Sequence, residues 1–343
     1  MKFITVTLNP CIDKTYVMPD ALTPGKLNRP ISVTVSPGGK GINAARALFR
    51  LVEEPSNKSA RALVYPVFFA GGNNGKLLVE SLKKTEMAAY EEHSVLNTVI
   101  PLPEGEETRT CVKIKDQNGR ITELNEPGAH IDEHSLELLF GAITDLVQSD
   151  EKTVALMCGS IPQGVEKNVY NLLIFMLKSC GAITVLDASG EPLREGLRGE
   201  PDLIKPNLEE LSYLAGRPLD FETEAVEYAE QIFHNHGTEV LLTNGGKGAV
   251  FVGKCGTVFG ETDSLSTGAV GSGDAFLAAF CSAYYSTLST CSLEDAEKAM
   301  RLACSAGYAT ALAYGKSGRT AIPDRDKLVE YRDKVRIRVK SEE

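Results

Sequence analysis

The sequence contains no tryptophan, no Cys-x-x-Cys pair and no apolar run long enough to cross a bilayer. Its first eight residues are too short and too polar to form the apolar region of a signal peptide. Positive charge is also scarce, because 46 acidic residues outnumber 36 Lys and Arg and leave a net charge of −10. That balance argues against nonspecific binding to nucleic acid or to an anionic membrane surface, so we expect neither partner.

The eight cysteines are scattered along the chain rather than paired by spacing. This distribution is typical of reduced thiols in a cytoplasmic protein, where several cysteines simply pack in the core. The cytoplasm is therefore the compartment we expect. A chain of 343 residues can bury a sizeable core, as one large domain or as one domain with a small appendage. Apart from the polar end at 340–343 it has no repeat or linker, and we expect one domain over residues 1–343.

Strands and helices alternate regularly from Ser135 onward, which predicts an α/β fold with a mostly parallel sheet covered on both faces. Ligands of such folds bind at the carboxyl ends of the strands. The expected helices are residues 135–147, 166–178, 208–214 and 222–235, and the expected strands are 153–157, 182–186, 203–205, 240–243 and 249–252.

The first third of the chain is richer in short extended segments. A strand at 3–8, a strand at 63–69 and a helix at 74–83 fit the main sheet. Asn118-Gly119 lies between two alternating runs at 110–115 and 120–124, and Asn-Gly is a strong hairpin signal. With extended runs at 11–17, 25–27 and 31–35, these segments predict a small second sheet, drawn from about 11–36 and 108–125.

The strongest chemical signal is a glycine loop, Gly271-Ser272-Gly273-Asp274, followed by an apolar helix. Glycine lets the backbone approach a ligand, and the free N–H groups of the helix start attract an anion. A carboxylate aimed at an anion site makes sense as the base that deprotonates a hydroxyl attacking a phosphoryl group. The simpler alternative is a capping Asp after a glycine turn.

Three earlier features remain ambiguous when taken singly. Residues 38–41, Gly-Gly-Lys-Gly, lack the spacing of a P-loop and could be a turn before a helix. Asp13 could be a turn residue. Arg109 could be an exposed edge charge or a guanidinium that holds a substrate phosphate.

Two later motifs also allow two interpretations. Asn207 and Glu210 have the spacing of a capping box, but they could equally organise water on Mg²⁺. The segment 243–248, Thr-Asn-Gly-Gly-Lys-Gly, could be a plain turn or a floor for nucleotide phosphates.

Together and in this order, the motifs are specific. From Thr7 to about Pro323 the chain resembles the PfkB carbohydrate kinases of the ribokinase-like superfamily. Residues 37–46, Pro-Gly-Gly-Lys-Gly-Ile-Asn-Ala-Ala-Arg, are similar to the branch of 1-phosphofructokinases and tagatose-6-phosphate kinases, as are 108–110, 125–128 and 158–165. The resemblance implies a three-layer ribokinase-like sandwich in which the small sheet forms a lid over the sugar.

The resemblance also implies roles for individual residues. Asp274 would be the catalytic base and Gly271, Ser272 and Gly273 the anion hole. Asn207 and Glu210 would act on Mg²⁺ through water. The positions that match nucleotide contacts are Lys205, Asn207, Thr243, Gly245 and Gly248; those that match sugar contacts are Asp13, Gly38, Gly39 and Asn43, with Lys26 and Arg109 as sugar-phosphate contacts.

The implied activity is transfer of a phosphoryl group from ATP, with Mg²⁺, to a ketohexose phosphate. Fructose 1-phosphate is the substrate we expect, tagatose 6-phosphate the nearest alternative, and a sugar-phosphate sensor without catalysis the remoter one. Glu123 lies where some fructose-6-phosphate kinases carry a basic residue, which disfavours that sugar. Ala269 and Cys11 also depart from the family pattern, though neither removes the base or the anion hole. A homodimer through the lid sheet is a further expectation.

Overall fold

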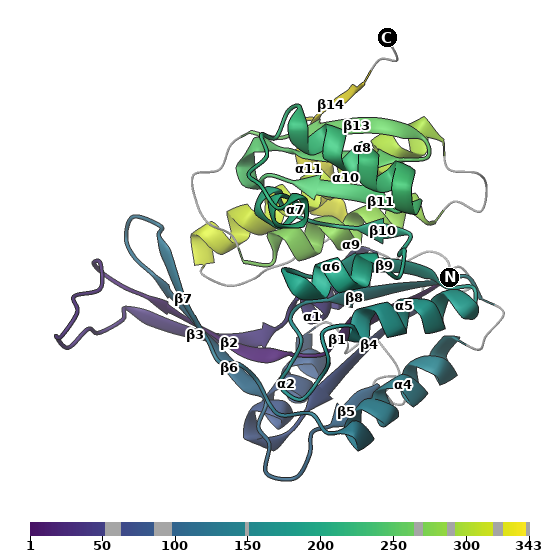
Figure 1. The fold of residues 1–343 in the computed structure, drawn as a ribbon. Helices are drawn as coiled ribbons and strands as arrows, with labels where there is room; N and C mark the ends of the chain where they lie inside the picture. The colour runs from purple at the N-terminus through teal and green to yellow at the C-terminus, as the bar shows by residue number, and fades with distance from the viewer. Residues whose placement is uncertain are drawn as a thin grey trace.

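The structure is a computed structural model that describes residues 1–51, 63–85, 98–147, 151–263, 270–286, 292–317 and 325–340. A ten-stranded sheet runs through the centre of the molecule in the order β14-β13-β12-β11-β10-β9-β8-β1-β4-β5 (Figure 1). Its strands are β1 (Lys2–Thr7), β4 (Leu63–Ala70), β5 (Val99–Pro101), β8 (Thr153–Cys158), β9 (Ile183–Asp187), β10 (Leu203–Ile204), β11 (Glu239–Thr243), β12 (Ala249–Gly253), β13 (Gly256–Glu261) and β14 (Arg336–Val339).

The sheet is parallel from β5 through β11, and β12, β13 and β14 continue it antiparallel. Every residue of β1 and β8 is buried, as expected where helices cover both faces of parallel strands. The predicted mostly parallel sheet is confirmed.

Two apolar cores lie on opposite faces of this sheet. In β1, Phe3 belongs to one core and its neighbour Ile4 to the other, because successive strand side chains point to opposite faces. The first core is closed by α1 (Lys40–Leu51), α2 (Gly72–Thr85), α9 (Ser272–Tyr284), α10 (Leu293–Ser317) and α11 (Arg325–Arg332); the second is closed by α4 (Glu133–Val147), α5 (Val169–Ser179), α6 (Glu191–Leu197), α7 (Leu208–Ala215) and α8 (Glu224–His236). The molecule is thus a three-layer sandwich.

A second sheet, called the lid sheet below, extends from the side of the sandwich (Figure 1, purple and blue strands). It consists of β2 (Cys11–Val17), β3 (Ser32–Gly38), β6 (Arg109–Lys115) and β7 (Ile121–Asn125) in the order β3-β2-β6-β7. The central pair, β2 and β6, is parallel, while β3 and β7 pair antiparallel at the edges. The predicted small sheet is confirmed.

Two predictions about this region are wrong in detail. Residues 25–27 form no strand but an exposed turn, in which Gly25 has φ of +74°. The side chain of Asn28 closes this turn, because its Oδ1 accepts from Thr23 N and its Nδ2 donates to Thr23 O. The turn expected at 38–41 is shorter, because β3 runs to Gly38 and α1 begins at Lys40. Gly39, at φ +114°, makes the whole turn, a conformation that glycine adopts without steric cost.

Among the described helices, none combines the length and apolar character that crossing a membrane would require.

Candidate active site

The carboxyl ends of β10 and β11 and the start of α9 open onto one cavity of about 610 Å³. The topology predicts this, since ligands of open α/β sheets bind beyond the carboxyl ends of the strands. The sequence-predicted residues that line the cavity are Lys205, Asn207, Glu210, Thr243, Gly245, Gly248, Ser272, Gly273 and Asp274. The structure therefore brings the predicted base and the predicted nucleotide contacts together. Gly268 and Ala269, which precede this glycine loop, lie outside the described residues.

The start of α9 offers backbone donors to this cavity. Gly271 precedes the helix in the left-handed conformation, with φ of +81°. The first helical hydrogen bond runs from Ala275 N to Gly271 O, so the N–H groups of the preceding turn have no intrahelical acceptor. Gly273 lies beside Lys205, since a Cβ built on it would stand 3.9 Å from that Nζ. An anion placed here would meet N–H groups, the positive helix end and an ammonium.

Asp274 lies in the first turn of α9 with only 8% of its surface exposed. Asn43, in the first turns of α1, donates from Nδ2 to Oδ2 of the carboxylate at 2.8 Å. Burial raises the pKa of Asp274 to about 6, and the charge of Asp187 adds to the rise, while Lys40 opposes it. A carboxylate with a pKa near the working pH is suited to accept a proton from a substrate hydroxyl.

Asp187, the last residue of β9, was missed in the sequence analysis. Its Oδ1 is 2.9 Å from Nζ of Lys40 and 3.4 Å from Nζ of Lys205, so it joins two cations beside Asp274. Burial alone would raise the pKa of Asp187, but the two ammonium groups lower it. Burial would likewise lower the pKa of Lys40, yet Asp187, Glu210 and Asp274 raise it. An acid that ends an apolar parallel strand was the available signal.

The residues present fit a hydrated Mg²⁺ ion. Among the described residues, Oδ2 of Asp187 is buried and has no hydrogen-bond partner, and a bound cation or its water would satisfy this acceptor. Glu210 points Oε1 toward the same cluster, at 3.7 Å from Nζ of Lys40. Carboxylate oxygens acting partly through water are the ligands that Mg²⁺ prefers.

Asn207 and Glu210 form the capping box that the sequence allowed. Asn207 Oδ1 accepts from Glu210 N at 2.7 Å, and Glu210 Oε2 accepts from Asn207 N at 2.9 Å. This reciprocal pair fixes the start of α7. Because Oε1 of Glu210 takes no part in the box, capping and a role toward the metal are compatible.

On the lid side, Asp13 is buried and accepts a hydrogen bond from Nζ of Lys113, a residue that the sequence analysis did not single out. Gly38 of β3 pairs with Cys11 and is close to Asp13, since a Cβ built on it would stand 2.6 Å from the Asp13 carboxylate. Asn43 connects this region to Asp274 through its amide. The predicted sugar contacts Asp13, Gly38, Gly39 and Asn43 thus occupy β2, the end of β3 and the start of α1.

Arg109 is not an exposed edge charge. Its guanidinium donates to the carbonyl oxygens of Glu126 at 2.9 Å and Asn9 at 2.8 Å, and to Ser160 Oγ at 3.3 Å. These contacts anchor the base of the lid sheet to the turn after β1. Whether the remaining N–H groups also meet a phosphate stays a prediction.

Lys26 is not brought to the other predicted residues. It lies in the exposed turn between β2 and β3, at the far end of the lid sheet (Figure 1). Asp13 is near the opposite end of β2, four residues before Val17, which corresponds to about 13 Å of strand. The role of Lys26 as a phosphate contact stays a prediction.

A sequence model of the pfkB family of carbohydrate kinases matches residues 6–321. The chain belongs to this family. It is 31% identical to the 1-phosphofructokinase of Bacillus subtilis (strain 168) over 310 residues, which is 90% of this chain and 92% of that protein. The identification confirms that the chain is a sugar kinase.

Solved structures of pfkB-like kinases agree with the fold. Phosphofructokinase-2 from Escherichia coli, solved with substrates and products, superposes with a TM-score of 0.79 at 25% identity, over 97% of this chain and 99% of that one. A ribokinase from Arabidopsis thaliana, solved with ribose and ATP, gives a TM-score of 0.69 at 20% identity, over 96% and 98%. The predicted ribokinase-like sandwich is confirmed.

Proposed function

We propose that this pfkB-family kinase transfers the γ-phosphoryl group of ATP to the free 6-hydroxyl of fructose 1-phosphate. The observation that carries the chemistry is Asp274, a buried carboxylate with a pKa of about 6 at the N-terminus of α9. The identity to a 1-phosphofructokinase over nine-tenths of the chain supports the sugar. Tagatose 6-phosphate remains the alternative substrate, since it too carries its phosphate at the end opposite a free primary hydroxyl.

In this mechanism Asp274 accepts the proton of the attacking hydroxyl, while Asn43 holds the carboxylate in place through Oδ2. The N–H groups at the start of α9 and Nζ of Lys205 stabilise negative charge on the transferring group. Bound Mg²⁺ would add positive charge beside the phosphates, held through Asp187 and Glu210 with Asn207 fixing the helix start. Asp13 and the backbone at Gly38 and Gly39 would orient the sugar.

The nucleotide would occupy the cavity of about 610 Å³ between β11 and α9. Thr243, Gly245 and Gly248 border it, and Gly248 has φ of +123°, which favours glycine. The E. coli phosphofructokinase-2 was solved with substrates and products, and the Arabidopsis ribokinase was solved with ribose and ATP. These complexes support the use of ATP by this chain.

Initial rates with MgATP on fructose 1-phosphate, tagatose 6-phosphate, fructose 6-phosphate and ribose test the proposal. We expect the highest kcat/KM with fructose 1-phosphate. A preference for tagatose 6-phosphate would replace the substrate, and sugar binding without turnover on any of the four would favour the sensor.

We further propose that the kinase forms a homodimer through the outer face of the lid sheet, the face that carries Lys14 and Tyr16 of β2. Cross-strand pairing puts Val33 opposite Tyr16 and Val35 opposite Lys14. Val33, Val35 and Leu124 are 47%, 50% and 60% exposed, although they are apolar and share this face. Contiguous apolar surface on a protein usually marks an interface.

The free thiols of the seven described cysteines support the expected cytoplasmic location.

A further inference from the structure

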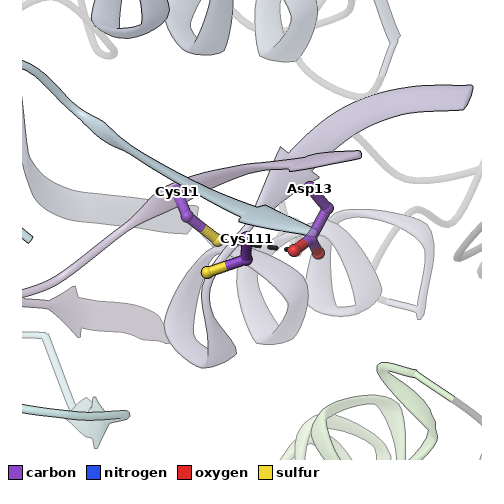
Figure 2. A group of neighbouring side chains, drawn as sticks. All are labelled: Cys11, Asp13 and Cys111. Atoms are coloured by element: carbon purple, nitrogen blue, oxygen red, sulfur yellow. Dashed lines mark hydrogen bonds between the residues drawn. The ribbon is translucent and has the colours of Figure 1, made fainter. Parts of the chain in front are cut away.

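Two cysteines and an aspartate meet on the inner face of the lid sheet. Cys11 and Asp13 are two residues apart in β2 and therefore share a face, and the parallel register puts Cys111 of β6 directly opposite Asp13. The two sulfur atoms and a carboxylate oxygen all lie within 4.8 Å of one another. Figure 2 shows the three side chains converging, and all three are buried.

Strand β3 makes room for this cluster by placing a glycine against it. Gly38 of β3 pairs with Cys11, and a Cβ built on it would stand 2.6 Å from Asp13 Oδ2 and 2.7 Å from Cys11 Sγ. No side chain other than that of glycine fits there without displacing the cluster. The space therefore depends on a glycine that Asp13 and Cys11 face.

The spacing suits an ion better than a disulfide. Around a tetrahedral Zn²⁺ ion, a thiolate sulfur and a carboxylate oxygen stand about 3.6 Å apart, from bond lengths of about 2.3 and 2.1 Å. Cys11 Sγ and Asp13 Oδ1 are 3.5 Å apart. Cys11 and Cys111 are diagonal neighbours in the register, so their Cα atoms are separated by roughly 7–8 Å, beyond the usual reach of a disulfide.

Lys113 balances the charge. Its ammonium group hydrogen-bonds the Asp13 carboxylate, and both side chains are buried. Two thiolates and one carboxylate around a divalent cation leave one negative charge, which this ammonium neutralises. A buried ion set of zero net charge avoids the desolvation cost of an uncompensated charge.

We propose that Cys11, Asp13 and Cys111 form a binding site for a thiophilic divalent cation such as Zn²⁺. Cysteine sulfur selects such ions over Mg²⁺ and Ca²⁺, which prefer oxygen alone. Three protein ligands leave the fourth tetrahedral position for water. Since Asp13 is also the proposed sugar contact, an ion held there excludes the sugar; this second part rests on the proposed function.

The test uses the full-length chain, freed of metal and kept reduced, without ATP or sugar. Titration with Cd²⁺ is followed by thiolate-to-metal charge-transfer absorption. We expect one equivalent to bind to the wild type and to Cys180→Ser, a control that removes an exposed cysteine. Cys111→Ser, and independently Cys11→Ala, should weaken binding at least about 100-fold, since loss of even an outer partner of a ligand costs 10–100-fold. Circular dichroism checks that each variant is folded.

A wild-type chain that gives no thiolate absorption overturns the proposal whatever the variants do, and so does equal binding to wild type and a folded Cys111→Ser. Zn²⁺ should bind the same site, so it should displace Cd²⁺ with loss of the absorption. These readouts need no turnover and hold even if fructose 1-phosphate is not the substrate.

A second experiment tests sugar exclusion. At fixed MgATP, Zn²⁺ should inhibit the wild type competitively with the sugar phosphate, while the rate of Cys111→Ser, relative to its own rate without Zn²⁺, should lose this sensitivity. Equal inhibition of both proteins, or inhibition independent of sugar concentration, would remove the coupling. Metal binding would then stand without it.

Discussion

Asp274 lies where water solvates its ionised form poorly, and the nearby charge of Asp187 disfavours ionisation further. Two hydrogen-bonding and ionic neighbours, Asn43 and Lys40, offset part of this cost. The same burial that gives the carboxylate a pKa suited to a base therefore lowers the stability of the folded state at neutral pH.

Asp274→Asn should separate these two effects. Without the base, kcat should fall by about 10²- to 10⁴-fold, with little change in nucleotide binding. Stability should rise by about 1–3 kcal/mol at pH 7.5, because a pKa displaced from 3.8 to about 6 makes the buried charge unfavourable by that order. Steady-state rates and urea denaturation measure the two. Near-wild-type turnover would remove Asp274 from the mechanism.

The pH profile provides an independent check. Only ionised Asp274 accepts a proton, so kcat/KM should drop about tenfold per pH unit below about 6. The free energy of unfolding changes in the opposite direction. In the folded protein Asp274 keeps its proton up to about pH 6, whereas in the unfolded chain it keeps it only to about pH 4. Asp274 therefore stabilises the fold most below about pH 4, and this contribution is lost between about pH 4 and 6. A kcat/KM that stays level from pH 8 to 5 would contradict the assignment.

At the level of elements, local patterns predicted what local physics decides. Asn118-Gly119 predicted the β6–β7 hairpin, whose loop uses Gly119 at φ of +78°, and alternation predicted the parallel sheet. Residues 25–27 failed because a strand needs a partner, and Asn28 closes a turn there instead. Cys11 and Cys111 come together only through a parallel register between segments a hundred residues apart, which no local pattern encodes.

The carboxyl end of β9 should tune the base at the start of α9. In Asp187→Asn, loss of the negative charge should lower the pKa of Asp274 and move the acid limb of kcat/KM below about 6. Stability should fall, by up to about 3 kcal/mol, because Lys40 and Lys205 lose their partner. Asp202→Asn is the matched control: it removes one negative charge at the other end of the same strand pair, where Asp202 accepts hydrogen bonds from Thr184, away from the cavity. An unshifted limb in Asp187→Asn would disprove the coupling.

The outer face of the lid sheet should control assembly. Val35→Glu places a charge at the centre of the proposed interface and should weaken dimerisation by at least about tenfold, since a desolvated unpaired charge costs several kcal/mol. Leu138→Glu is the control, an equally apolar residue of α4 that is 40% exposed. Sedimentation velocity over a concentration series measures both. A monomeric wild type, or equal effects of the two changes, would refute this interface.

For the whole molecule, the proposed mechanism has the sandwich hold the phosphoryl-transfer end of the reaction and the lid sheet hold the other end of the sugar. Asp274 and the start of α9 belong to the rigid core, where Ala275 and Leu277 are fully buried. Asp13 and Arg109 lie on strands that leave it. The attacking hydroxyl must reach Asp274, so a phosphate anchored by the lid sheet must lie at the far end of the sugar.

The remote phosphate should therefore matter more than any single hydroxyl. We expect kcat/KM for free fructose to be at least about 100-fold below that for fructose 1-phosphate, because binding energy far from the reacting atom orients the reacting centre.

Arg109→Ala should raise KM for the sugar phosphate by about 10- to 100-fold and leave KM for ATP nearly unchanged, as expected for losing a charge-assisted hydrogen bond worth about 1.5–3 kcal/mol.

The same variant separates an anchor from a structural contact. Arg109 also holds the carbonyl oxygens of Asn9 and Glu126. If that is its whole role, Arg109→Ala lowers kcat/KM for fructose and fructose 1-phosphate by the same factor. If it binds the phosphate, free fructose is nearly unaffected and the two substrates converge in kcat/KM. Arg109→Lys keeps the charge but not the forked set of N–H donors. With fructose 1-phosphate, its kcat/KM should therefore lie between those of the wild type and Arg109→Ala, and with free fructose it should not change.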